Sequence, residues 1–308
     1  MSLKRVNLEY SDIPAYLPPI DYFLEKISTY DKFNFLRVNH GFIDSLYYAY
    51  SDYELLKTQL VDGNYDLIGK TAHSSYNDVK WGFSHFHGVT ENVWKFSSLL
   101  LKILVENKKL SDTLDLSISL GVGLNEHWGV WEDGNPIQIA RTKFAKILTD
   151  ITNQTFIYSG VFKHYTIRGE IFKMFELLNQ MNYEVIFLGP SFFKRYEEVF
   201  SITNFQFIEI PPKGAIAHTE SYIQQIKNIQ SKSFRPTILF HMCGHIMSAK
   251  IVYELLNIHI FTVDVGRSFD ILIKDEFVNG NQAQKCWTFL DEVQLNKYVD
   301  NLINNSYV

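Results

Sequence analysis

The second half of the chain alternates short apolar runs with segments of helical length, and this order restricts the fold more than any other feature. The apolar runs are rich in β-branched and aromatic residues, as buried strands are. Strands that alternate with helices need crossover connections, so the pattern predicts a Rossmann-like α/β fold whose sheet is mostly parallel and has helices on both faces. The predicted strands are Glu184–Leu188, Phe205–Ile210, Thr237–Met242 and Ile258–Val265, and the predicted helices are Arg168–Met181, His218–Ile229 and Ile246–Leu256.

The first half contains two further segments of the same kind. Asn34–Val38 is a predicted strand that turns at residues 39–41 into a helix over Phe42–Tyr50, and Asp115–Leu120 is a second strand that stops at Gly121-Val122-Gly123. We expect both strands to join the same sheet. No repeat or linker divides the chain, so it is predicted to form a single domain over residues 1–308, with residues 1–160 and 161–308 as working halves.

Charge and cysteine content narrow the class of protein. A net charge of -5 without a basic run argues against nucleic acid as a partner, because phosphate neutralisation needs a Lys/Arg face. The two cysteines, Cys243 and Cys286, lack the spacing of a disulfide framework or a zinc site. No export signal and no apolar stretch of membrane-spanning length is present. We therefore expect a cytoplasmic protein without a transmembrane segment.

Ligands of open parallel sheets bind beyond the carboxyl ends of the strands, so the turns after the predicted strands are the candidate sites. Gly244 and His245, followed by Ser248, lie between a strand and a helix. Glycine lets the backbone approach a pyrophosphate, and the helix start supplies free N–H groups; a plain tight turn explains the segment equally well. Gly189 and Ser191 follow another strand, where a helix cap is the favoured interpretation of the serine.

Charged residues follow two other strands. Lys213 could balance a phosphate, although a solvated loop lysine is the more ordinary alternative. Asp264, Gly266, Arg267 and Asp270 place opposite charges around one strand end, where a structural Asp264–Arg267 ion pair is an equal alternative.

The turn after the first strand is also polar. Arg37 could bind phosphate through two hydrogen bonds, Asn39 opens the turn, and His40 could act as a base or donor, with Asp44 one helical turn later. His85 and His87 could face one side of an extended segment as metal ligands, but without a third ligand they are better interpreted as ordinary surface histidines.

The segment from Glu184 to Asp270 resembles the C-terminal half of GT-D type glycosyltransferases, a bacterial family first catalogued as a domain of unknown function. Three blocks match in order: FIEIPPKGAIAHTESYIQQI resembles the family's Pro-Ser-Lys-Asn-Ala-Phe segment, TILFHMCGHIMSAKIVYELL its Leu-Gly-Pro-Thr-Ala-Thr turn, and FTVDVGRSFDI its Asp-Ile-Gly-His-Ile-Asp strand end. Upstream, FLRVNHGFIDSL stands where the family has Arg-Phe-Gly-Asp-Gly-Glu. The blocks cover under half of the chain.

The resemblance implies a hexosyltransferase that moves a sugar from a nucleoside diphosphate donor, commonly a UDP-sugar, to a hydroxyl of a glycan or glycoconjugate acceptor. The matching residues are Arg37, Lys213, Gly244, Asp264, Gly266 and Asp270. The family's metal-binding Asp-x-Glu is replaced by His40-Gly41-Phe42, and the Asn after its Lys by Gly214. A bound Mg²⁺ or Mn²⁺ would thus lack its usual oxygen ligands, which puts metal dependence in doubt. We predict no metal ligands and no certain cofactor.

On this interpretation, Arg37, His40 and Lys213 would compensate the charge of the leaving diphosphate. The general base stays open among His40, Asp44, Asp264 and Asp270. The alternative is a catalytically inactive nucleotide- or glycan-binding protein on the same fold, and a homodimer is an open option in either case. A methyltransferase or dehydrogenase is disfavoured, because no Gly-rich first turn with a later acid is visible. The predicted donor-binding residues are Arg37, Asn39, Gly189, Ser191, Lys213, Gly244, His245, Ser248, Gly266 and Arg267.

Overall fold

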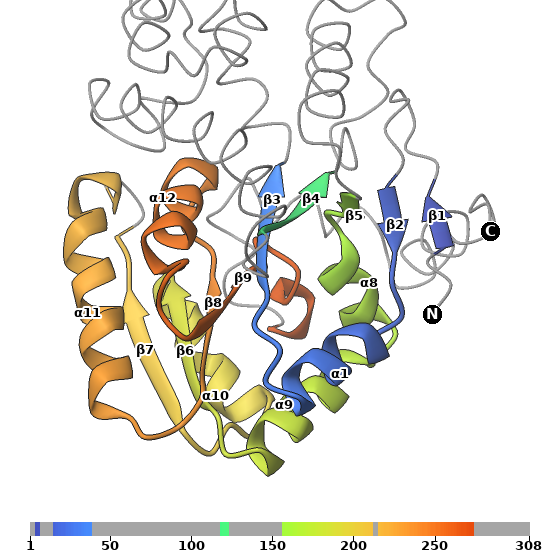
Figure 1. Ribbon diagram of the computed structural model, residues 1–308, viewed down its shortest axis with the longest axis horizontal. Helices are drawn as coiled ribbons and strands as arrows, with labels where there is room; N and C mark the ends of the chain where they lie inside the picture. Colours follow the sequence, from blue (N-terminus) through green and yellow to red (C-terminus); the bar gives the residue numbers. More distant parts are fainter. Residues whose placement is uncertain (1–3, 7–14, 39–117, 123–155, 212–214, 274–308) are drawn as a thin grey trace, which may run out of the picture.

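The computed structural model describes residues 4–6, 15–38, 118–122, 156–211 and 215–273, which form one nine-stranded sheet flanked by helices (Figure 1). The strand order is β1-β2-β5-β4-β3-β9-β8-β6-β7. All neighbouring strands are parallel except β1 and β2, which confirms the predicted mostly parallel α/β fold. The strands are β1 (Lys4–Val6), β2 (Ala15–Leu17), β3 (Asn34–Val38), β4 (Ile118–Val122), β5 (Phe156–Tyr158), β6 (Glu184–Gly189), β7 (Phe205–Glu209), β8 (Thr237–His241) and β9 (Ile260–Asp264).

The described helices lie between successive strands of the chain. In the described part of the chain they are α1 (Asp21–Ser28), α8 (Val161–Ile167), α9 (Ile171–Gln180), α10 (Tyr196–Val199), α11 (Thr219–Lys232) and α12 (His245–Leu255), with 3₁₀ turns η1 (Ser191–Arg195), η2 (Ala215–His218) and η3 (Asp270–Leu272). The four strands and three helices predicted for the second half are therefore confirmed, and β3 has the predicted bounds.

The first half agrees with the sequence prediction where the structure describes it. β4 spans Ile118–Val122 and ends within the predicted stop at residues 121–123, although Gly121 itself still pairs with Arg37 of β3. The ladder to β3 runs on past this glycine because backbone pairing needs no side chain. The helix predicted over Phe42–Tyr50 lies outside the described residues. The sheet joins β1–β5 to β6–β9 across residue 160, and the working halves remain a prediction.

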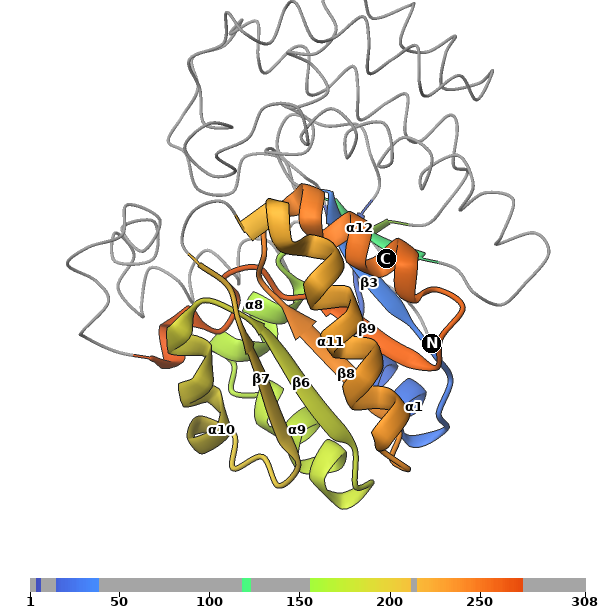
Figure 2. The same cartoon turned by 90° about the vertical axis from the view of Figure 1, so that its left-hand side faces the viewer.

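Helices cover both faces of the sheet (Figure 2). Successive side chains of a strand point to opposite faces, so each strand contributes to two cores. On one face, residues such as Phe187 and Phe240 pack with α1, α8 and α9. On the other, Ile186 and Leu239 pack with α11 and α12. The strands between the two layers are buried on both sides, which is why they appear as nearly continuous apolar runs.

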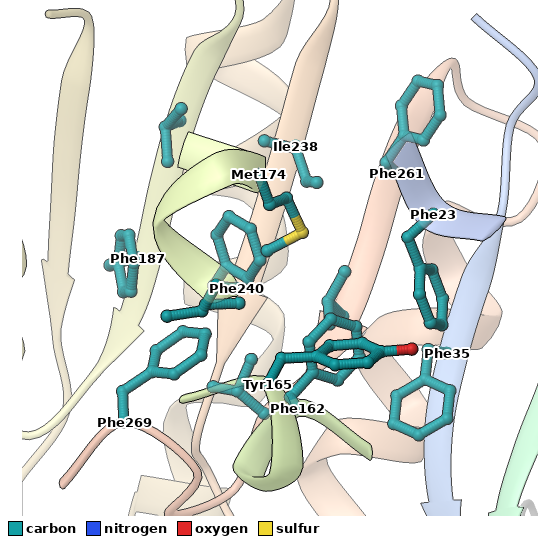
Figure 3. Packing of buried hydrophobic residues seen from close by; sticks show 14 of the residues in the cluster. Phe23, Phe35, Phe162, Tyr165, Met174, Phe187, Ile238, Phe240, Phe261 and Phe269 are labelled. Carbon is teal, nitrogen blue, oxygen red and sulfur yellow. The ribbon is translucent and has the colours of Figure 1, made fainter. Parts of the chain in front are cut away.

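The larger core is built from aromatic rings, as the Phe-rich composition indicates (Figure 3). Phe240 of β8 packs against both Phe187 and Phe269, whose ring centroids lie 5.2 and 6.0 Å from its own. Phe175 of α9 approaches Phe240 to 5.1 Å. Phe269 belongs to the turn that follows β9, so this packing anchors the neighbouring charged residues Arg267 and Asp270 to the core.

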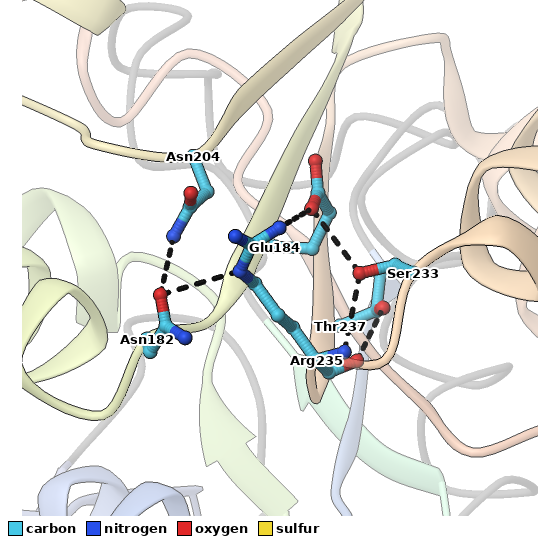
Figure 4. Close-up of polar contacts among 6 residues, drawn as sticks. All are labelled: Asn182, Glu184, Asn204, Ser233, Arg235 and Thr237. Atoms are coloured by element: carbon cyan, nitrogen blue, oxygen red, sulfur yellow. Dashed lines mark hydrogen bonds and ion pairs between the residues drawn. The ribbon is translucent and has the colours of Figure 1, made fainter.

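A polar network holds the opposite, amino edge of the sheet (Figure 4). The buried carboxylate of Glu184 accepts hydrogen bonds from the Ser233 hydroxyl at 3.2 Å and from Arg235 Nη1 at 3.4 Å. Arg235 Nε also donates to Asn182 Oδ1 at 3.3 Å, and the Asn204 amide donates to the same oxygen at 2.9 Å. The loops before β6, β7 and β8 are thereby joined to one another.

Candidate functional site at the carboxyl edge of the sheet

Three adjacent strands, β3, β9 and β8, end at the same edge of the sheet because they are parallel. The chain leaves β6 toward β7 on one side and leaves β8 toward β9 on the other. Neighbouring strands whose connections diverge in this way form the crevice in which α/β proteins bind ligands. His241, the last residue of β8, lies at this crevice, and Asp264 is its partner on β9.

Arg37 and Gly266 come together at this edge from opposite ends of the described chain. Gly266 has φ of 49°, a left-handed conformation that favours glycine. A Cβ atom built on Gly266 would overlap Nη1 of Arg37, so the guanidinium lies directly on the glycine backbone. Nε of Arg37 is buried and has no hydrogen-bond partner in the described part of the chain. The glycine is thus required both by its conformation and by the space that Arg37 occupies.

The turn after β9 carries a second arginine. Arg267 Nε donates to Oδ2 of the buried Asp270 at 2.6 Å, so the arginine pairs with Asp270 and not with Asp264 as one alternative had it. Asp264 Oδ1 instead accepts the Gly266 N–H at 3.1 Å. Burial raises the pKa of Asp270 to about 6, against the opposing effect of Arg267. Asp270 Oδ1 and Arg267 Nη1 are buried without partners in the described chain.

Tyr196 of α10 adjoins this ion pair from the aromatic core. Its hydroxyl is near enough to lower the pKa of the Asp270 carboxyl, yet it makes no hydrogen bond of good geometry within the described residues. Burial, followed by the negative charge of Asp270, raises the pKa of the Tyr196 hydroxyl well above its usual value. The phenol therefore stays neutral and offers a proton that a ligand oxygen could accept.

A buried polar cluster lies beneath the start of α12. Ser248 Oγ is 3.1 Å from His241 Nδ1 and 3.4 Å from Cys243 Sγ. Ser248 is 1% exposed, so its hydroxyl serves this internal contact, whereas the sequence analysis had it bind the donor. Burial lowers the pKa of His241 and raises that of Cys243, which keeps both side chains neutral.

The first turn of α12 presents backbone donors at the same edge. Gly244 has φ of 81° and precedes α12, and no side chain makes a capping hydrogen bond to the start of this helix. The N–H of Ser248 bonds to the Gly244 carbonyl at 2.9 Å, so the N–H groups before Ser248 have no partner within the helix. Lys250, one turn on, is engaged by Glu254 at 2.7 Å and Glu220 at 3.2 Å. The helix start itself, with its partial positive charge, is what an anion would meet.

The turn after β6 is arranged differently. A Cβ on Gly189 would overlap the ring of Phe193, so this glycine makes room for the core. Ser191 is the first residue of η1; Pro190 precedes the turn without a side-chain hydrogen bond, so the predicted capping by Ser191 is wrong. An open depression of about 460 Å³ here is lined by Ser191, Phe192, Lys194, Arg195, Glu197 and Glu198.

Several predicted site residues fall outside the described part of the chain, namely Asn39, His40, Asp44 and Lys213, and His245 is described only as the first helical residue of α12. The sequence analysis missed His241 and Tyr196. His241 carries a recognisable signal, because it is a polar residue at the last position of an otherwise apolar strand. Tyr196 carries none, since an aromatic residue in an aromatic-rich segment is indistinguishable from core.

Unpartnered buried groups gather at this edge. Among the described residues, six buried side-chain atoms lack a hydrogen-bond partner, and five of them belong to Arg37, Tyr196, His241, Arg267 and Asp270. Buried polar atoms are normally satisfied, so a local concentration of exceptions is typical of a ligand site. In the same described ranges, no group of three or more His, Cys, Asp or Glu side chains could hold a metal ion, and no helix is long and apolar enough to cross a membrane.

Comparison with known proteins gives one similar structure. No family model matches the sequence, and a search of curated proteins finds no match. Among solved structures, the chain is similar to a selenomethionine-substituted domain of unknown function 1792, with 14% identity over 90% of each chain and a TM-score of 0.49. The fold assignment therefore depends on the strand order and helix placement of this chain itself.

Proposed function

We propose that this chain is a glycosyltransferase that moves a sugar from a nucleoside diphosphate donor, in the simplest case a UDP-sugar, to a hydroxyl acceptor. The observation that carries the proposal is the cluster of unpartnered buried polar groups, two guanidinium groups among them, at the carboxyl ends of β3, β8 and β9. The resemblance to GT-D type glycosyltransferases at Arg37, Asp264, Gly266 and Asp270 supports the same edge of the sheet.

The charges of the cluster suit a diphosphate. A buried guanidinium N–H without an acceptor is costly, and phosphate oxygens are the acceptors that arginine binds best. Arg267 is ion-paired with Asp270, whereas Arg37 has no ion pair with another described residue, so Arg37 is the guanidinium that remains available to a ligand. As the glycosidic bond breaks, the diphosphate gains negative charge, and fixed cationic groups stabilise that change most. The free N–H groups at the start of α12 would add to this stabilisation.

Asp270 is our candidate for the general base that activates the acceptor hydroxyl. Its Oδ2 is held by Arg267, while Oδ1 has no partner in the described chain and could accept a proton. Burial brings the pKa of this carboxyl to about 6, close to the neutral range in which a base works best. Asp264 is less suited, because its Oδ1 already accepts the Gly266 N–H.

Metal dependence is proposed to be absent, because His40-Gly41-Phe42 replaces the acidic motif on which it would depend. The test is to incubate the purified chain with a panel of nucleoside diphosphate sugars and measure nucleotide release with and without EDTA. We expect release that EDTA does not abolish and that Arg37→Met abolishes, with Arg235→Met at the amino edge as the matched control. Nucleotide binding without release would indicate an inactive binding protein, and no binding of any nucleotide would refute both.

A further inference from the structure

His241 is a fully buried polar side chain for which the proposed function has no role. It ends β8, is 0% exposed, and pairs in register with Asp264 at the end of β9. Paired residues of parallel strands project to the same face, which here is the face covered by α12. The imidazole therefore lies beside the Asp264 carboxylate, whose charge acts on it.

The hydrogen bonds around His241 indicate where its proton lies. Cys243 keeps its proton, so a chain of donors can run from the Cys243 thiol to the Ser248 hydroxyl and on to His241 Nδ1. Nδ1 is then an acceptor, and the neutral ring carries its hydrogen on Nε2. The reverse direction would leave the buried Nε2 as an acceptor without a donor while the negative charge of Asp264 acts on the ring, which is electrostatically unfavourable. Nε2 is buried and has no partner in the described chain.

Asp264 links His241 to the anion-binding arginine. Its Oδ1 accepts the Gly266 N–H at 3.1 Å, which fixes the left-handed turn, and the Arg37 guanidinium lies directly on Gly266. We propose that His241 is a positioning residue whose Nε2–H orients the Asp264 carboxylate through one bridging water, and thereby sets the Gly266 turn that places Arg37. This inference rests on the proposed function for the identity of the ligand, but not for the arrangement of the four residues.

Two substitutions separate a positioning role from simple core packing. His241→Gln places an amide N–H near the position of Nε2, whereas His241→Asn places one near Nδ1. We expect His241→Asn to weaken the binding of UDP and of inorganic pyrophosphate about tenfold by calorimetry, the loss of one hydrogen bond to a charged group. His241→Gln should stay within about threefold of the wild type at a similar melting temperature. Equal weakening by both variants would overturn the proposal.

A second measurement on the unliganded wild type keeps the inference independent of the ligand and of the folding of the variants. Nitrogen NMR shifts of His241 should show a proton on Nε2 and none on Nδ1. The Arg37 Nε–H signal should move in His241→Asn and stay in place in His241→Gln. A wild type that binds neither UDP nor pyrophosphate ends the proposed function, while these signals still decide the role of His241. A proton on Nδ1, or an Arg37 signal that stays in place in both variants, refutes the positioning role of His241.

Discussion

The two edges of the sheet differ in how their buried polar groups are paired: of the unpartnered buried side-chain atoms in the described chain, only Asn34 Nδ2 belongs to a residue that begins a strand. At the amino edge, Glu184 accepts bonds from Ser233 and Arg235. Close by, the ammonium of Lys32 donates to the carbonyls of Leu255, Leu256 and Ile258 at the end of α12. At the carboxyl edge, Arg37, Arg267 and Asp270 each keep a buried atom without a partner in the described chain.

On the proposed function, this difference separates groups that stabilise the fold from groups that bind the ligand. A satisfied polar network contributes to stability, whereas an unsatisfied buried group costs about 1–3 kcal/mol. Such a cost persists when function requires it, and stability is commonly lower at binding sites for this reason. The comparison predicts that substitutions at the carboxyl edge change binding more than stability, and that those at the amino edge do the reverse.

Arg37→Met should have the largest effect. Two charge-assisted hydrogen bonds to a diphosphate are worth about 1.5–3 kcal/mol each, so their loss should weaken UDP binding about a thousandfold. The unfolding free energy should stay the same or rise, because the substitution removes a half-buried charge whose Nε lies buried without a hydrogen bond in the described chain. Calorimetric titration and chemical denaturation measure the two quantities. If Arg37→Met instead loses stability and keeps its affinity for UDP, Arg37 serves the fold and the predicted difference between the two edges is wrong.

Asp270 should make the unfolding free energy decrease as the pH rises. Its pKa is raised by burial from 3.8 in the unfolded chain to about 6 in the folded one. The folded state therefore holds this proton more tightly, and the resulting stabilisation is complete below pH about 4 and lost as the pH rises through about 6. Two pKa units correspond to about 3 kcal/mol.

The variant Asp270→Asn isolates this contribution from those of other carboxyls. The unfolding free energy of the wild type minus that of the variant should decrease by about 3 kcal/mol between pH 4 and pH 7. Denaturant titrations at a series of pH values give this difference directly. A difference that is constant or increases with pH would mean that Asp270 is not held in a desolvated state.

Gly266→Ala and Gly169→Ala form a matched pair that sharpens the comparison. Both glycines have positive φ, at 49° and 70°, so alanine strains the backbone at either position by about 1–2 kcal/mol. A Cβ at Gly169 meets nothing within 4 Å, whereas a Cβ at Gly266 overlaps Arg37. Both variants should lose stability in denaturation experiments, but only Gly266→Ala should weaken UDP binding, by at least about tenfold. Equal UDP affinities in the two variants would show that Arg37 does not bind the ligand.

The core of the fold could be predicted from the sequence because burial on both faces leaves an unmistakable pattern. β6, β8 and β9 are nearly uninterrupted apolar runs between helices with one apolar stripe. The strands β2 and β5 could not be predicted, since three residues are too few for a period; they become strands through pairing, β5 with β4 and β2 with β5 and β1.

The site could be predicted only in part, for a reason that lies in how it is assembled. The edge of the sheet follows from topology, so Arg37, Asp264 and Gly266 were found as residues at strand ends. Which side chains turn toward a ligand depends on packing that no single segment encodes. Ser248 was expected to face the ligand, but the helical turn directs it to His241, and Arg267 pairs with Asp270 because Phe269 anchors the turn in the core.

Arg235→Met should have the smallest effect, and it tests the amino edge. The arginine pairs with Glu184 at 3.4 Å, but its side chain is 43% exposed, so solvent screens the pair and the loss of unfolding free energy should be about 1 kcal/mol. The Ser233 hydroxyl still donates to Glu184, which limits the cost of leaving that buried carboxylate without its cation. UDP affinity should be unchanged, because the substitution lies at the opposite end of the strands from Arg37. A loss of affinity comparable to that of Arg37→Met would show that the two edges are coupled through the sheet, and the separation of stability from binding would then fail.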